Sequence, residues 1–263
     1  MRYVLLTLVS VYIALMPFMA QAGEKPVVAY SFDDIKGDNV EDISGFGNDG
    51  TLEDNPKIVD GKFGKGLEFE SNRVTIPASD SLSPNLFQGS FTLVVWINPK
   101  REGNEWQQVM MAEGPPKARD TIFINNDGRL SWRGRVAGNW AGGMCETAPG
   151  VVDANTWTHV AVVGDTSNFR IYVDGELTME SAFQTTDGGN ENHYIGGNPT
   201  IPDESYSGAV DDFAIFTVAL KEADIVAIKD NGLASVVSVE SKGKIATKWA
   251  TLKGAFRHGS QLK

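Results

Sequence analysis

The amino-acid sequence predicts an all-β fold in which two antiparallel sheets pack as a jelly-roll sandwich, with one short helix after the closing strand. A dozen or so short apolar, β-branched runs recur along the chain, separated by turn-forming Gly, Pro, Asn and Asp residues. A helical spacing of apolar residues follows the last run, at 221–229, and Asn231-Gly232 is its stop signal. Many short strands and one late helix are typical of a sandwich or jelly roll.

The apolar runs place the strands along the chain. The first strand is expected at 27–32 and ends at Asp33-Asp34. Residues 67–70 and 74–76 form an expected hairpin, and a central strand, apolar on both faces, is expected at 91–97. Further strands are expected at 109–112, 121–124, 129–133, 157–163, 169–173 and 176–179.

The closing strand, expected within 206–216, contains an unusual acidic pair. Val210, Phe213 and Ile215 are apolar, whereas Asp211 and Asp212 interrupt the alternation between them. Charged groups in a strand that closes a β-fold need a partner, because an unpaired buried charge is costly. The pair therefore marks a candidate site.

The N-terminus has the pattern of a signal peptide over residues 1–22. Arg2 precedes an apolar run at 3–19, and Ala20-Gln21-Ala22 is a small-residue cleavage site. We expect a secreted protein, either extracellular or periplasmic. An uncleaved membrane anchor is the alternative, because the run is nearly long enough to span a bilayer. No later segment is apolar enough to cross a membrane.

Composition narrows the classes of partner. Cys145 is the only cysteine, so the chain is expected to be free of disulfides, and a main domain at 23–232 is large enough to build a core without them. The net charge is −11, and because 241–263 holds six basic residues and no acidic one, the rest carries −17. An acidic body disfavours nucleic acid as a partner, because phosphate contacts need a basic face, and it suits the binding of cations.

Eight stretches follow one another in a recognisable order. They are 30–33 (YSFD), 42–52 (DISGFGNDGTL), 61–69 (GKFGKGLEF), 91–99 (FTLVVWINP), 157–160 (WTHV), 170–175 (RIYVDG), 194–197 (YIGG) and 208–216 (GAVDDFAIF), with Ala219-Leu220 after the last. Over about residues 27–232 the chain thereby resembles the LamG-like (laminin G/pentraxin-type) family of concanavalin A-like jelly rolls. The resemblance implies that the first and last strands are neighbours. Function still has to be argued from sites.

The resemblance also implies a structural calcium site. Members of the family often hold Ca²⁺ beside the first and last strands, and Asp33, Asn48 and Asp211 match its acidic and amide positions. Ca²⁺ takes six to eight oxygen ligands, which carboxylates, amides and backbone carbonyls supply. Asp212 stands where the family commonly has Glu. The alternative is that these residues are turn formers and solvated carboxylates.

A carbohydrate site is expected in the Gly-rich segment 132–140. Trp140 has little local reason to lie in such a loop, and sugars are recognised by aromatic faces with a few polar groups placed around them. The expected ligand-binding residues are Trp106, Trp132, Arg133, Arg135, Asn139 and Trp140. Trp132 lies in an expected strand, where a Trp is more often part of the core.

Catalysis is the minority interpretation of this sequence. The E-x-D-x-x-E strand motif of concanavalin A-like glucanases, with its paired carboxylates, does not occur. The nearest match, Glu222-Ala-Asp224, lies in the expected helix and lacks the second Glu. His159 suits a packed role, and neither His193 nor His258 has metal-ligand spacing with another His.

The sequence therefore favours a non-catalytic module that binds carbohydrate or an extracellular partner. An adhesion or scaffold module without a sugar site is one alternative, and a glycan-active hydrolase or lyase is another. The tail at 233–263 departs from the domain: Ile245, Trp249 and Leu252 are spaced as on a basic amphipathic helix. Four roles are open for this tail: docking on the acidic body, contact with an anionic surface, an export or sorting signal, or a partly ordered basic terminus.

Overall fold

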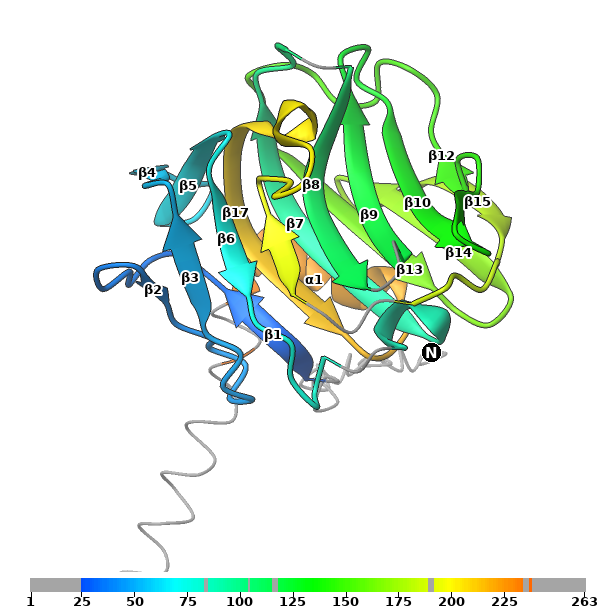
Figure 1. Cartoon of the computed structure of the whole chain (residues 1–263), viewed down its shortest axis with the longest axis horizontal. Helices are drawn as coiled ribbons and strands as arrows, with labels where there is room; N and C mark the ends of the chain where they lie inside the picture. Colours follow the sequence, from blue (N-terminus) through cyan, green and yellow to red (C-terminus); the bar gives the residue numbers. More distant parts are fainter. Residues whose placement is uncertain are drawn as a thin grey trace, which may run out of the picture.

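The computed structural model describes residues 25–82, 85–103, 105–114, 118–188, 192–233 and 237, and they form a two-sheet β-sandwich. Figure 1 shows the second sheet in front of the first, with α1 behind both. The predicted signal peptide at 1–22 lies outside the described residues, as does the tail at 233–263 apart from Leu233 and Val237. Among the described residues no helix is long and apolar enough to cross a membrane.

The first sheet has the order β15-β14-β13-β7-β17-β5-β4, and β1 also pairs with β17. All of these pairings are antiparallel. Its strands are β1 (Pro26–Tyr30), β4 (Lys57–Asp60), β5 (Lys65–Glu70), β7 (Phe91–Pro99), β13 (Thr158–Gly164), β14 (Asn168–Val173), β15 (Glu176–Ala182) and β17 (Ser207–Phe216).

The second sheet has the order β11-β10-β9-β8-β16-β6-β3-β2, and β12 also pairs with β10. Its strands are β2 (Asn39–Val40), β3 (Gly50–Glu53), β6 (Arg73–Ile76), β8 (Trp106–Gly114), β9 (Ala118–Asn125), β10 (Leu130–Val136), β11 (Asn139–Trp140), β12 (Cys145–Glu146) and β16 (His193–Ile195). Outside the sheets lie the 3₁₀ turns η1 (Leu86–Gln88) and η2 (Pro202–Glu204) and the helix α1 (Glu222–Asn231).

Two apolar clusters hold these layers together. The larger lies between the sheets and includes Phe69, Phe91 and Trp132. The smaller lies on the outer face of the first sheet, where Ile225 and Ile228 of α1 pack with strand residues that include Val94, Ala161 and Ala214. The first sheet is therefore apolar on both faces, which explains the continuous apolar run of β7.

The structure confirms the sandwich, the late helix and the neighbouring first and last strands, since β1 pairs with β17. The expected hairpin of 67–70 with 74–76 is wrong. β5 pairs with β4 and β17 in the first sheet, whereas β6 pairs with β3 and β16 in the second. Ser71 has a φ of +72°, and this local reversal carries the chain from one sheet to the other.

Candidate functional site

The acidic pair of the closing strand lies at a β-bulge. The register of β17 against β7 shifts between Asp211 and Ala214, and Asp212 adopts a φ of +46°. An extra residue in one strand lets two consecutive side chains escape the normal alternation. Both carboxyl groups are consequently buried.

Three carboxylates surround the turn between β4 and β5. Asp211 Oδ2 accepts the backbone N–H of Phe63 at 2.9 Å, and Asp33 Oδ1 accepts that of Lys65 at 2.8 Å. Asp212 Oδ2 accepts the N–H of Leu233, just beyond α1, at 3.0 Å. Asp211 and Asp212 thereby tie β17 to the β4–β5 turn and to the end of the helix, and Asp33 ties the segment after β1 to the same turn.

The buried pair is costly to ionise. Burial raises the pKa of Asp211 to about 7, and the neighbouring Asp212 carboxylate adds to that rise. Burial also raises the pKa of Asp212 to about 6, with a contribution from Asp33. Such a cluster attracts positive charge, whether a proton or a metal cation.

Asn48 lies in a different network. Its Nδ2 donates to the carbonyl of Val27 at 2.6 Å, and its Oδ1 accepts from Ser79 Oγ at 2.6 Å. The structure therefore brings Asp33 and Asp211 to one turn but does not bring Asn48 to them. Within the described ranges, no group of three or more His, Cys, Asp or Glu side chains is arranged to hold a metal ion. Calcium stays a prediction.

Four of the six predicted carbohydrate-binding residues, Trp106, Arg133, Arg135 and Trp140, gather on the outer face of the second sheet. Trp106 makes an edge contact with Phe123 at 5.7 Å between ring centroids, and Phe123 makes one with Trp140 at 6.1 Å. The guanidinium of Arg133 lies over the Trp106 ring, 3.9 Å from its centroid, and that of Arg135 lies over the Trp140 ring, 4.7 Å from its centroid. We call these five residues the aromatic–arginine strip.

The strip combines an exposed ring with anchored cations. Trp140 is 38% exposed, so part of its indole remains open to a ligand. Arg133 bonds to Glu146 Oε2 at 3.1 Å, and Arg135 Nη1 donates to the carbonyl of Gly138 at 2.8 Å. Stacked and hydrogen-bonded guanidinium groups are held in place, which lowers the entropy lost when a ligand binds.

Two of the six predicted residues have other roles. Trp132 is fully buried between the sheets, with its ring 5.2 Å from Phe87 and 5.1 Å from Phe91, so its inclusion in a surface site is corrected. The reason is strand alternation, which points it inward between the outward-facing Arg133 and Ser131. Asn139 donates to the carbonyl of Ala137 within its own turn.

Phe123 is the member of the strip that sequence reasoning missed. Its neighbours Ile122 and Ile124 belong to the core between the sheets. Alternation therefore puts Phe123 on the outer face, and this alternation is the signal that could have found it. Pairing of β9 with β8 and β10, which only the fold reveals, places it between Trp106 and Trp140.

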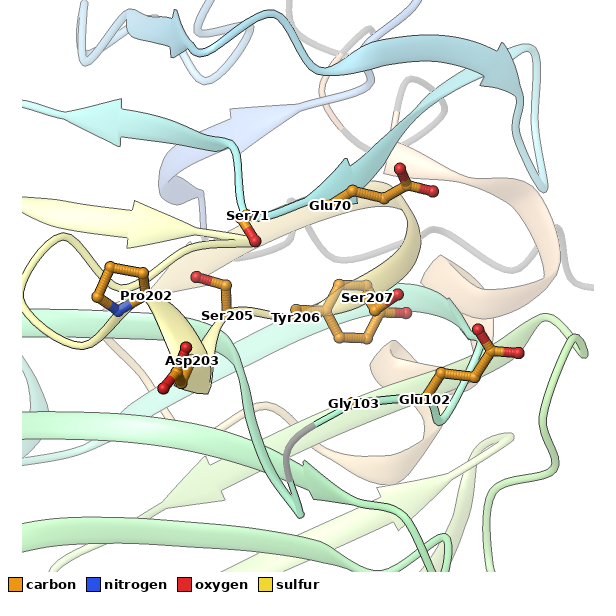
Figure 2. A pocket seen from close by; sticks show the side chains of 9 residues that line it. All are labelled: Glu70, Ser71, Glu102, Gly103, Pro202, Asp203, Ser205, Tyr206 and Ser207. Atoms are coloured by element: carbon orange, nitrogen blue, oxygen red, sulfur yellow. The ribbon is translucent and has the colours of Figure 1, made fainter.

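A separate cavity of about 510 Å³ lies where η2 leads into β17. It was not predicted from the sequence. Its lining is polar, and Figure 2 shows Glu70 and Glu102 at one end with Asp203 at the other; the residues are Glu70, Ser71, Glu102, Gly103, Pro202, Asp203, Ser205, Tyr206 and Ser207. Exposed aromatic rings do not contribute, since Tyr206 is buried.

His159, His193 and Cys145 are packed inside, whereas His258 lies outside the described residues. Burial lowers the pKa of His159 to about 3 and that of His193 to about 4, so both rings are neutral at physiological pH. Cys145 is buried as a free thiol, and burial raises its pKa. None of the three lies on the aromatic–arginine strip.

Solved structures with the same fold include sugar-binding and enzyme chains. Domain 4 of the arabinanase AbnA from Geobacillus stearothermophilus, in complex with arabinotriose, has a TM-score of 0.61 and 18% identity, covering 78% of this chain and 98% of that one. The binding domain of Paraclostridial Mosquitocidal Protein 1 has a TM-score of 0.62 and 18% sequence identity, and the match covers 78% of this chain and 52% of that one. Trypanosoma rangeli sialidase has a TM-score of 0.56 and 18% sequence identity, and the match covers 77% of this chain and 32% of that one.

These likenesses establish the fold, since all three identities are low. The chain spans about half of the mosquitocidal binding-domain chain and about a third of the sialidase. No curated protein matches the sequence. The family model described as Concanavalin A-like lectin/glucanases superfamily matches residues 70–226, which is more than half of the chain. The protein therefore belongs to the concanavalin A-like lectin/glucanase superfamily.

Proposed function

We propose that this protein is a secreted, non-catalytic module that binds carbohydrate through the aromatic–arginine strip. The observation that carries the proposal is the partly exposed Trp140, with Arg135 over one face of its ring and Phe123 at its edge. An indole face stacks on the apolar face of a sugar ring, and the adjacent guanidinium donates to hydroxyl or carboxylate oxygens. The similar arabinanase domain, which was solved with arabinotriose, supports the ligand class.

A glycan array that includes arabinotriose tests the proposal. We expect the wild-type protein to bind a subset of glycans and Trp140→Ala to lose about tenfold or more in affinity, since truncating a hot-spot aromatic residue costs about 2 kcal/mol or more and about 1.4 kcal/mol is tenfold. Phe46→Ala is the matched control, because Phe46 is 52% exposed and lies before β3, at the far end of the second sheet from β11. Equal glycan binding by the two variants would rule out the aromatic–arginine strip as the carbohydrate-binding site.

An extracellular adhesion or scaffold module without a sugar site is the alternative. It predicts no glycan binding by the wild-type protein. The non-catalytic assignment rests on the missing paired-carboxylate motif and on the burial of His159, His193 and Cys145. Turnover of array-positive polysaccharides in a hydrolase or lyase assay would overturn it.

We also propose a structural calcium ion at Asp33 and Asp211. The support is the gathering of carboxylates at the β4–β5 turn, where a cation would offset their mutual repulsion. These two carboxylates have the right chemistry, whereas Asn48 is engaged with Val27 and Ser79 and does not belong to this set. The ion would fix the closing strand against the first strand rather than take part in chemistry.

A further inference from the structure

The turn that carries Trp140 has an unfavourable backbone. Val136 pairs with Asn139 in the β10–β11 hairpin, so Ala137 and Gly138 are its two turn residues. Their φ angles are +52° and +75°, the pair of positive values found in tight type I′ hairpins. Gly adopts this region freely, but Ala does not, because its Cβ crowds the neighbouring carbonyl oxygen. Some other contact must hold the turn.

Asp187 supplies that contact from outside the hairpin. Its Oδ1 accepts the N–H of Ala137 and its Oδ2 accepts that of Gly138, both at 2.7 Å. Its own N–H donates to the carbonyl of Arg135 at 2.8 Å. One residue therefore bonds to both turn amides and to the strand before them. β11 is only two residues long and pairs with β10 at only two positions, so its pairing alone is a weak support.

Thr186, the preceding residue, is anchored in the interior. Its Oγ1 donates to Asp120 Oδ2 at 3.2 Å, and its carbonyl accepts from Gln88 Nε2 at 2.8 Å. Gly134 lies against Thr186 and Asp120. A Cβ at position 134 would overlap the Thr186 methyl group and crowd the Asp120 carboxyl group. Residues 186 and 187 therefore cannot shift relative to β9 and β10 without breaking these contacts.

We propose that Asp187 is a positioning residue for the ligand surface. It holds the Ala137-Gly138 turn, and through it Trp140, in the conformation that presents the indole ring, and Thr186 on Asp120 anchors it from the interior. The inference rests on the proposed function in one respect: if Trp140 binds carbohydrate, its displacement weakens that binding. The positioning itself is a property of the protein without ligand.

Amide hydrogen exchange on the full chain tests the proposal without a ligand. The N–H of Ala141 donates to the carbonyl of Gly134 across the hairpin, so its protection reports hairpin closure. Asp187→Ala should speed its exchange by about tenfold, the size expected when hydrogen bonds to a charged acceptor are lost. Adding Ala137→Gly should restore protection, because Gly adopts positive φ without the Cβ penalty.

Asp165→Ala is the matched control. Asp165 Oδ1 likewise accepts two backbone N–H groups, from Ser167 and Asn168, but in the β13–β14 turn of the other sheet. This variant should leave Ala141 exchange unchanged. The proposal is overturned if Asp187→Ala leaves the exchange unchanged, or if Ala137→Gly fails to restore it. A glycan array without binding would remove the proposed function and leave this result standing.

Discussion

Asp120 is a buried carboxyl group whose Oδ1 has no hydrogen-bond partner among the described residues. Burial raises its pKa from 3.8 to about 7, and nearby Asp187 adds to the rise. Its side chain lies on the inner face of β9, on the same side as Ile122 and Ile124. The carboxyl group at this position is favoured in its protonated, neutral form, because the ionised form would be a buried charge without a compensating positive charge.

The pH dependence of stability follows from this shift. The folded protein keeps the Asp120 proton up to about pH 7, whereas the unfolded chain releases it near pH 4. The stabilising contribution is therefore fully present below about pH 4 and is lost as pH rises through about 7. Asp120→Asn, which does not titrate, should gain stability relative to wild type over this range, by up to about 4 kcal/mol.

Urea unfolding at pH 5 and at pH 8.5 measures this difference, which should grow by about 2–3 kcal/mol between the two pH values. Acidic groups common to both proteins, including Asp211 and Asp212, cancel in the comparison. Asp203→Asn, at an exposed carboxylate of η2, is the control for the same chemical change outside the interior. A gap between wild type and Asp120→Asn that stays constant with pH would contradict the prediction.

At the scale of elements, the bulge in β17 connects the closing strand to α1. Asp212 Oδ2 accepts the N–H of Leu233 directly after the helix, and Ile225 and Ile228 bury the helix against the outer face of the first sheet. Isolated helices of ten residues are marginal in water. The helix therefore depends on this docking.

Ile225→Ala should lower the free energy of unfolding by about 2–4 kcal/mol, the usual cost of a large-to-small change at a fully buried site. Asp224→Ala, at an exposed position of the same helix, should change it by less than about 1 kcal/mol. Chemical denaturation of both variants measures the effect. Similar changes for the two would mean that burial of Ile225 against the first sheet contributes little to stability.

At the scale of the whole molecule, the β4–β5 turn joins the beginning of the chain to its end. Asp33 follows β1, and Asp211 belongs to β17, the strand that pairs with β1. A cation bound there only in the folded state would stabilise the complete sandwich by mass action. The proposed calcium ion is therefore best tested through global stability.

EDTA should lower the melting temperature by about 5–10 °C, which corresponds to about 2.7 kcal/mol for an ion present at a hundred times its dissociation constant. Added Ca²⁺ should restore it. Asp33→Asn should abolish the calcium-dependent part, whereas Asn48→Ala should retain it, since Asn48 lies in another network. The absence of both an EDTA effect and bound metal by elemental analysis would exclude the ion.

The sequence by itself determined the sandwich, because strand periodicity and turn residues are local properties. It located the central strand at Phe91, the late helix and the acidic pair. It also predicted that Trp140 and Arg135 lie in a Gly-rich loop, where the structure has the β10–β11 hairpin. Each of these depends on residues close together in the chain. The family match over 70–226 agrees with that assignment.

Only the tertiary structure decided which residues meet. It sent β5 and β6 to different sheets, separated Asn48 from Asp33, buried Trp132 and placed Phe123 between two tryptophans. The contact of Asp187 with the Ala137-Gly138 turn spans about fifty residues of chain. Such contacts depend on strand order and register, which are set by packing across the whole sandwich rather than by local sequence.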